Sequence, residues 1–132
     1  MKYIVDIDGT ICEQVEVPNW GTGEVYYDRI ERINQLYREG HTIVYYTARG
    51  MGSTTNPDGL YTGTYIDENR ENWYDYTEKQ LKEWGCLYSE LHLGKYSGDI
   101  YIDDKGVNSE VFFCSPCKSE GRESNSDYRK WR

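Results

Sequence analysis

Near the start of the chain, residues 3–11 read YIVDIDGTI, in which a short apolar run leads directly into Asp6 and Asp8 and then Gly9. The β-branched and aromatic residues predict a strand over 2–5, and the lack of polar alternation favours burial on both faces, as in a parallel sheet. Acids in or beside a core cost free energy unless a partner or a ligand compensates them. The question is what compensates these two carboxylates.

Strand-like and helix-like segments alternate along the rest of the chain. Helices are indicated by apolar residues at helical spacing, the first with Asp28 as its N-cap, and strands by short apolar runs. The alternation predicts an α/β fold, a three-layer Rossmann-like parallel sheet flanked by helices. The expected elements are strands over 2–5, 41–46, 87–93 and 99–102, helices over 28–39 and about 69–84, and a short helix or strand over 107–113.

The composition describes an acidic chain of 132 residues, with 15 Lys and Arg against 23 Asp and Glu, for a net charge of -8. This length fits one domain, expected over 1–113, and the polar segment 114–132 is expected to be a disordered tail. The charge argues against nucleic acid as a partner, because such binding depends on clustered Lys and Arg. The start of the chain has no long apolar segment, so no signal peptide or membrane span is expected, and free thiols in the cytoplasm are the default.

Three expected strands end on polar side chains, Asp6, Thr47 and Asp103. In open parallel sheets, ligands bind beyond the carboxyl ends of the strands. We therefore expect these side chains to meet at one edge of the sheet and to form a binding site there.

Four motifs, in this order along the chain, resemble those of the haloacid dehalogenase (HAD) superfamily, whose members are mostly magnesium-dependent phosphatases. DIDGT (residues 6–10) is similar to the first motif, Thr47 in YYTAR to the second, Lys95 in LGK to the third, and IDD (residues 102–104) to the fourth, acidic metal site. The likeness is strongest to small capless phosphatases of the capsular-polysaccharide or sugar-phosphate type. It covers residues 1–113 and implies a HAD-like fold.

The resemblance implies a phosphomonoester hydrolase that works through an aspartyl phosphate. Asp6 would be the nucleophile, Asp8 the general acid and base, and Thr47 and Lys95 the groups that bind and neutralise the phosphoryl oxygens. The implied cofactor is Mg²⁺, which removes the repulsion between a carboxylate and a phosphate dianion. The implied magnesium ligands are Asp6, Asp8 through its backbone carbonyl, Asp103 and Asp104, with the direct ligand of the last two left open. Substrate contacts are expected from Gly9, Thr10, Ala48 and Arg49.

Several residues also have a structural interpretation. Arg49 can clamp a substrate phosphate or carboxylate, or form a surface ion pair, and both remain open. Thr47 can be an ordinary strand residue and Lys95 a solvated one. His41 and His92 are read as structural, because magnesium prefers oxygen to imidazole. The pair Cys114 and Cys117 has zinc-like spacing, but a structural zinc site needs four ligands.

The spacing of the motifs leaves no room for a cap domain. Residues 11–27 can form only a β-hairpin flap around Trp20, and residues 48–94 must already supply a helix and a strand, with 50–65 as a lid-like loop. We therefore expect a small phosphorylated substrate such as a sugar phosphate. The alternatives are a nucleotide or nucleic-acid-end phosphatase, a receiver-like module that accepts a phosphoryl group without turnover, and a non-catalytic binding module. The oligomeric state is not indicated.

Overall fold

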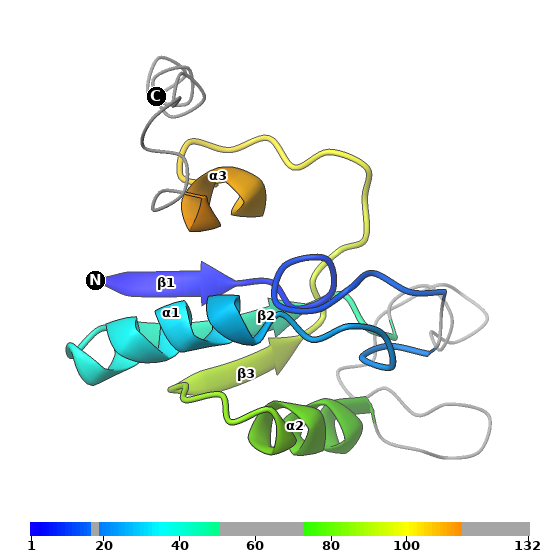
Figure 1. Cartoon of the computed structure of the whole chain (residues 1–132). Coiled ribbons are helices and arrows are strands. Elements are labelled where there is room, and N and C mark those ends of the chain that lie inside the picture. The colour runs from blue at the N-terminus through cyan, green and yellow to red at the C-terminus, as the bar shows by residue number, and fades with distance from the viewer. Residues whose placement is uncertain (17–18, 51–72, 115–132) are drawn as a thin grey trace. The chain divides into compact units, whose positions relative to one another are not determined.

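A computed structural model of the whole chain describes residues 1–16, 19–50 and 73–114. The chain divides into two compact units, Met1–Ser97 and Gly98–Arg132, and each is described by itself. In chain order the elements are β1 (Lys2–Val5), α1 (Tyr27–Arg38), β2 (Thr42–Thr47), α2 (Trp73–Glu83), β3 (Glu90–Leu93) and α3 (Ser109–Phe113) (Figure 1).

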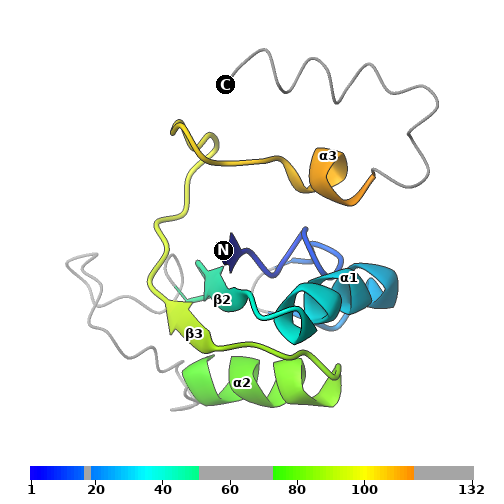
Figure 2. The same cartoon turned by 90° about the vertical axis from the view of Figure 1, so that its left-hand side faces the viewer.

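The first unit contains a parallel sheet of three strands in the order β1-β2-β3. In the register of this sheet, Val5 pairs with Tyr45 and Tyr45 pairs with Leu91. α1 lies beside β2 and α2 beside β3 (Figures 1 and 2). The expected α/β layout, a parallel sheet flanked by helices, is confirmed, whereas the three-layer, HAD-like arrangement stays a prediction.

The two sides of strand β1 differ in burial. Val5, Tyr45 and Leu91, which share a face because they are register partners, are 8%, 0% and 5% exposed. Ile4 points to the opposite face and is 56% exposed. The expected burial of β1 on both faces is therefore wrong. The two crossovers step in the same direction across the sheet, so right-handed connections place both helices on one face.

Helix α1 packs through Ile30 and Ile33, which are 2% and 1% exposed. The expected cap at Asp28 is wrong, because Asp28 lies in the first turn and the N-cap position makes no side-chain bond. The buried Asn34 side chain donates to the carbonyl of Gly85 (2.9 Å) and accepts from the backbone N–H of Leu87 (2.8 Å). These bonds tie α1 to the connection between α2 and β3.

Helix α2 buries three residues on one side, Trp73, Thr77 and Leu81. The expected start of this helix near residue 69 lies outside the described residues. Two further aromatic residues at or just after this helix lie further out, since Tyr74 is 38% exposed and Trp84 is half-buried. α2 is therefore a helix with one buried stripe, and a threonine lies in the middle of that stripe.

The segment between β1 and α1 folds back on itself. Cys12 and Val25 form an antiparallel bridge, and the backbone N–H of Glu13 donates to the carbonyl of Glu24 (2.7 Å). These contacts are the base of the region in which a β-hairpin flap is expected, and residues 17–18 lie outside the described part. The flap as a whole stays a prediction.

The second unit is described over residues 98–114. All residues of 99–102 are described and none belongs to a strand, so the expected strand is wrong; Ile100 and Ile102 are 78% and 92% exposed. A strand needs a hydrogen-bonded neighbour, and no other strand is described within this unit. The expected element over 107–113 is the helix α3, capped by Asn108, whose side chain accepts from the N–H of Glu110 (2.8 Å).

The expected tail lies outside the described residues except for Cys114, so its disorder stays a prediction. Within the part of the chain that the structure describes, every helix is too short or too polar to cross a membrane.

Candidate functional site

The DIDGT segment forms a tight turn directly after β1. The backbone N–H groups of Thr10 and Ile11 donate to the carbonyl of Ile7 (3.0 and 2.9 Å), and the N–H of Gly9 donates to the carbonyl of Cys12 (2.8 Å). Gly9 has φ of 82°, a backbone conformation that other residues adopt only with strain. Ile7 and Ile11 are fully buried, so they anchor the turn in the core. The acids on either side of Ile7 are thereby fixed at the carboxyl end of the strand.

The Asp6 carboxylate is loosely held and partly open. Thr10 Oγ1 donates to Asp6 Oδ2 (3.3 Å), and Lys95 Nζ lies 3.7 Å from Asp6 Oδ1. The Asp6 side chain is 35% exposed. Burial raises the pKa of Asp6 above its usual value, and the neighbouring Lys95 opposes that shift. Asp6 is therefore an accessible carboxylate beside one cation.

The Asp8 carboxylate has the opposite character. Arg49 grips both of its oxygens, with Nε 2.8 Å from Oδ2 and Nη2 2.9 Å from Oδ1. The two side chains are 9% and 0% exposed. Cys12 Sγ also donates to Asp8 Oδ1 (3.5 Å), and burial raises the pKa of Cys12 to about 12, which keeps the thiol protonated. Asp8 is a buried carboxylate in a two-point ion pair.

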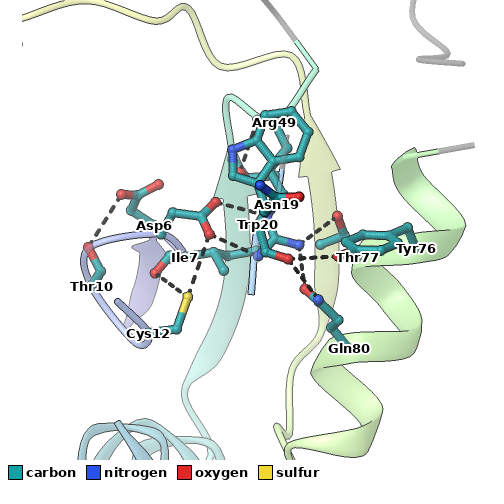
Figure 3. Close-up of polar contacts among 12 residues, drawn as sticks. Asp6, Ile7, Thr10, Cys12, Asn19, Trp20, Arg49, Tyr76, Thr77 and Gln80 are labelled. Carbon is teal, nitrogen blue, oxygen red and sulfur yellow. Dashed lines mark hydrogen bonds and ion pairs between the residues drawn. The ribbon is translucent and has the colours of Figure 1, made fainter. Parts of the chain in front are cut away.

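Arg49 itself is held by three further bonds. Nη1 donates to Thr77 Oγ1 (3.1 Å) and to Gln80 Oε1 (2.7 Å), both on α2, and the backbone N–H donates to Thr47 Oγ1 (3.1 Å) (Figure 3). The ion pair that the sequence suggested for Arg49 exists, but it is buried and not on the surface. All three guanidinium nitrogens are already bonded to side chains of the protein. Contact between Arg49 and a substrate stays a prediction.

A loop residue extends this network. The carbonyl of Trp20 accepts from Gln80 Nε2 (2.9 Å) and from the Tyr76 hydroxyl (2.8 Å). The Trp20 ring is 5% exposed and packs edge-on against Trp73, with ring centroids 4.8 Å apart. The loop is therefore fastened to α2.

Sequence reasoning missed Thr77, Gln80 and Cys12 as members of the site. One signal was present, because Thr77 falls on the apolar side of its helix, where an unexplained hydroxyl indicates a polar partner in the core. Gln80 carries no comparable signal, since a glutamine on a helix is ordinarily solvated.

Thr47 and Lys95 lie at the same edge of the sheet, where β2 and β3 end. Thr47 closes β2 and is 1% exposed, and its carbonyl accepts from the backbone N–H of Lys95 (3.2 Å) just after β3. The structure thus brings together Asp6, Asp8, Thr47, Arg49 and Lys95. Of the other expected substrate contacts, Ala48 lies between Thr47 and Arg49, and Gly9 and Thr10 belong to the turn after β1.

Asp103 and Asp104 belong to the second unit. Asp103 Oδ1 accepts from the N–H groups of Lys105 (2.8 Å) and Gly106 (2.6 Å), and Asp104 Oδ2 lies 3.2 Å from Lys105 Nζ. Among the described residues, no three His, Cys, Asp or Glu side chains come close enough together to hold a metal ion. The implied ligands are all oxygen atoms, which is the donor set that Mg²⁺ prefers. Their assembly into one site stays a prediction.

Comparison with models of known families and with curated proteins gives no match. Among solved structures, the chain is similar to the crystal structure of an MCSG target from Vibrio cholerae, with a TM-score of 0.66 and 23% sequence identity. The similarity covers 99% of this chain and 98% of that one. At this level of identity it shows a shared fold and carries no statement about activity.

Proposed function

We propose that this chain is a magnesium-dependent phosphomonoester hydrolase of the HAD type, acting through an aspartyl phosphate on Asp6. The observation that carries the proposal is the contrast between two carboxylates at one strand end. Asp6 is 35% exposed and lies 3.7 Å from the Lys95 ammonium, whereas the Asp8 side chain is 9% exposed and paired with Arg49. Two acids in such different environments suit two different roles in one reaction.

In the first step, an Asp6 oxygen attacks phosphorus and the bond from phosphorus to the leaving oxygen breaks. Protonated Asp8 gives its proton to that oxygen, so an alcohol departs and the phosphoryl group stays on Asp6. In the second step, water attacks phosphorus and ionised Asp8 takes a proton from it, which releases phosphate and restores both carboxyl groups. Lys95 and the Thr47 hydroxyl neutralise and orient the transferring phosphoryl oxygens.

Magnesium would be held by the Asp6 carboxylate, the backbone carbonyl of Asp8, and Asp103 with Asp104. When bound, it supplies positive charge that lets an anionic nucleophile approach an anionic ester. The exposure of Asp6 supports this assignment, because its carboxylate is 35% exposed and has room for a ligand.

The proposed substrate is a small phosphorylated metabolite such as a sugar phosphate. The support is the short interval between β1 and α1, where Trp20 is fastened to α2 by two hydrogen bonds to its carbonyl. The interval is too short for a folded cap domain, which suits a compact substrate.

The test is a screen of sugar, nucleotide and amino-acid phosphates with Mg²⁺, following the release of inorganic phosphate. We expect turnover of at least one sugar phosphate, loss of activity with EDTA, recovery with added Mg²⁺, and no turnover by Asp6→Asn. Glu31→Gln, at an exposed position on α1, is the matched control and should behave as the wild type. Preference for nucleotides would change the substrate class, and activity that survives both EDTA and Asp6→Asn would overturn the proposal.

A further inference from the structure

The general acid and base of the proposed reaction receives little support from its own turn. Asp8 precedes Gly9, and within the turn its side chain accepts one hydrogen bond, a long one from the Cys12 thiol (3.5 Å). The side chain is instead fixed by Arg49, 41 positions along the chain, through two bonds of 2.8 and 2.9 Å. A planar guanidinium that meets both oxygens fixes the plane of a carboxylate as well as its location.

Arg49 is fixed in turn by α2. Its remaining terminal nitrogen donates to Thr77 (3.1 Å) and to Gln80 (2.7 Å), so the guanidinium cannot rotate without breaking bonds to this helix. Gln80 is itself held from the other side by the carbonyl of Trp20. A Cβ added at Gly21 would collide with the Gln80 amide, so the loop packs closely against it.

The bonds at Asp8 distinguish its two oxygens. Oδ1 accepts from Arg49 Nη2 and from the Cys12 thiol, whereas Oδ2 accepts only from Arg49 Nε among the described residues. Among the described residues, Oδ2 therefore has one donor and Oδ1 has two, so Arg49 is the main group that orients Oδ2.

We infer that Arg49 is a positioning residue that acts through Asp8, with Thr77 and Gln80 holding Arg49 in place. The inference rests on the proposed function, in which the Asp8 side chain gives a proton to the leaving oxygen as the phosphorus–oxygen bond breaks and then takes a proton from the attacking water.

The test compares two esters that differ in their need for that proton. Glycerol phosphate releases an alkoxide, which must be protonated as it leaves, whereas nitrophenyl phosphate releases a stable phenolate without help. General acid catalysis contributes about 10²–10⁴-fold, so misplacing the acid should penalise the first ester selectively. For each variant the measured quantity is the ratio of kcat/KM for the two esters at saturating Mg²⁺.

Arg49→Lys keeps the charge and loses the two-point grip, and we expect it to lower the alkyl-to-aryl ratio by about tenfold or more. Gln80→Met, a gentler change that leaves the Arg49–Asp8 pair in place, should lower the ratio in the same direction by a smaller factor. The matched controls are Arg38→Lys, which alters an exposed Arg–Glu31 pair, and Gln35→Met on the surface of α1. Both controls should leave the ratio unchanged.

In an Asp8→Asn background, Arg49→Lys should change the alkyl rate no further, because its effect passes through Asp8. Equal losses on both esters in folded Arg49→Lys, a rise in the alkyl rate, or full additivity with Asp8→Asn would overturn the inference while leaving the proposed function intact. A wild-type protein that hydrolyses neither ester nor any member of the phosphate screen would overturn both.

Discussion

The chain has two pairs of neighbouring acids, Asp6 with Asp8 and Asp103 with Asp104, and their side chains are held in different ways. In the first unit, Asp8 is gripped by Arg49 from a distant part of the sequence, and Arg49 is fixed by α2. In the second unit, Asp103 is held by the backbone N–H groups of Lys105 and Gly106, two and three residues away. The first pair thus depends on tertiary structure, and the second is organised by its own turn.

The difference has a consequence for how each pair responds to change. A buried ion pair that loses one partner leaves an uncompensated charge in the core. An exposed carboxylate in a local turn can lose its charge at little cost, because water solvates whatever remains. Substitutions near the first pair should therefore affect folding and catalysis together, whereas substitutions at the second should affect them separately.

The largest expected effect is on stability at Arg49. Arg49→Met removes the cation and leaves Asp8 buried, so we expect the free energy of unfolding to fall by about 3–5 kcal/mol. Urea denaturation followed by circular dichroism measures this quantity. The double variant Asp8→Asn with Arg49→Met should recover part of the loss. No recovery would mean that Arg49 stabilises the fold mainly through α2.

Lys95→Ala tests the contact between Lys95 and Asp6, the more exposed acid of the first pair. Lys95 lies 3.7 Å from Asp6 and is 24% exposed, so its loss should disturb the fold little. By analogy with other electrostatic groups aimed at a transition state, we expect kcat to fall about 10²–10³-fold. Steady-state kinetics with Mg²⁺ measures this, and Lys82→Ala on the exposed side of α2 is the control. An effect below threefold would remove Lys95 from the site.

Gly21→Ala tests whether the loop at Trp20 and Gly21 supports the Asp8–Arg49 ion pair through Gln80. Gly21 has φ of 81°, and an added Cβ would meet the Gln80 side chain. We expect a loss of about 1–2 kcal/mol in the free energy of unfolding, from the strained conformation and the displaced amide. Gly98→Ala, where a Cβ meets open space, is the control. Equal free energies of unfolding for the two variants would show that the loop adjusts to the added Cβ at little cost and does not support the ion pair.

The smallest effect is expected at the second pair. Asp103→Asn keeps an oxygen that can accept the same backbone bonds, so the free energy of unfolding should change by less than about 0.5 kcal/mol. Activity should nevertheless be lost if this carboxylate binds magnesium. A thermal melt and a phosphate-release assay on the same sample separate the two. A loss of stability as large as that of Arg49→Met would show that the second acid pair also depends on tertiary structure.

Much of the first unit follows from local sequence signals. The apolar runs that become β1, β2 and β3, and the helical spacing of Ile30 and Ile33, predict the elements because most of these apolar residues are buried. The ends of the strands then predict that Asp6 and Thr47 face one edge. The strand predicted over 99–102 is wrong, because the sequence does not distinguish the exposed Ile100 and Ile102 from the apolar residues of a buried strand.

The support around Asp8 could not be predicted in the same way. It depends on which of many polar side chains meet after folding, and Arg49 could equally have faced substrate or solvent. Thr77 and Gln80 reach Arg49 because α2 packs against β3. No local sequence pattern predicts contacts between residues so far apart in the chain. Sequence therefore indicates candidates for chemistry better than it indicates the residues that orient them.

The proposed mechanism requires Asp6 to form a bond to phosphorus when magnesium is present. Beryllofluoride mimics a phosphoryl group on an aspartate, and fluorine NMR detects its bound form directly. We expect a protein-bound resonance that requires Mg²⁺, disappears in Asp6→Asn and survives in Glu31→Gln. A resonance that persists in Asp6→Asn, or none in the wild-type protein with Mg²⁺, would contradict the mechanism.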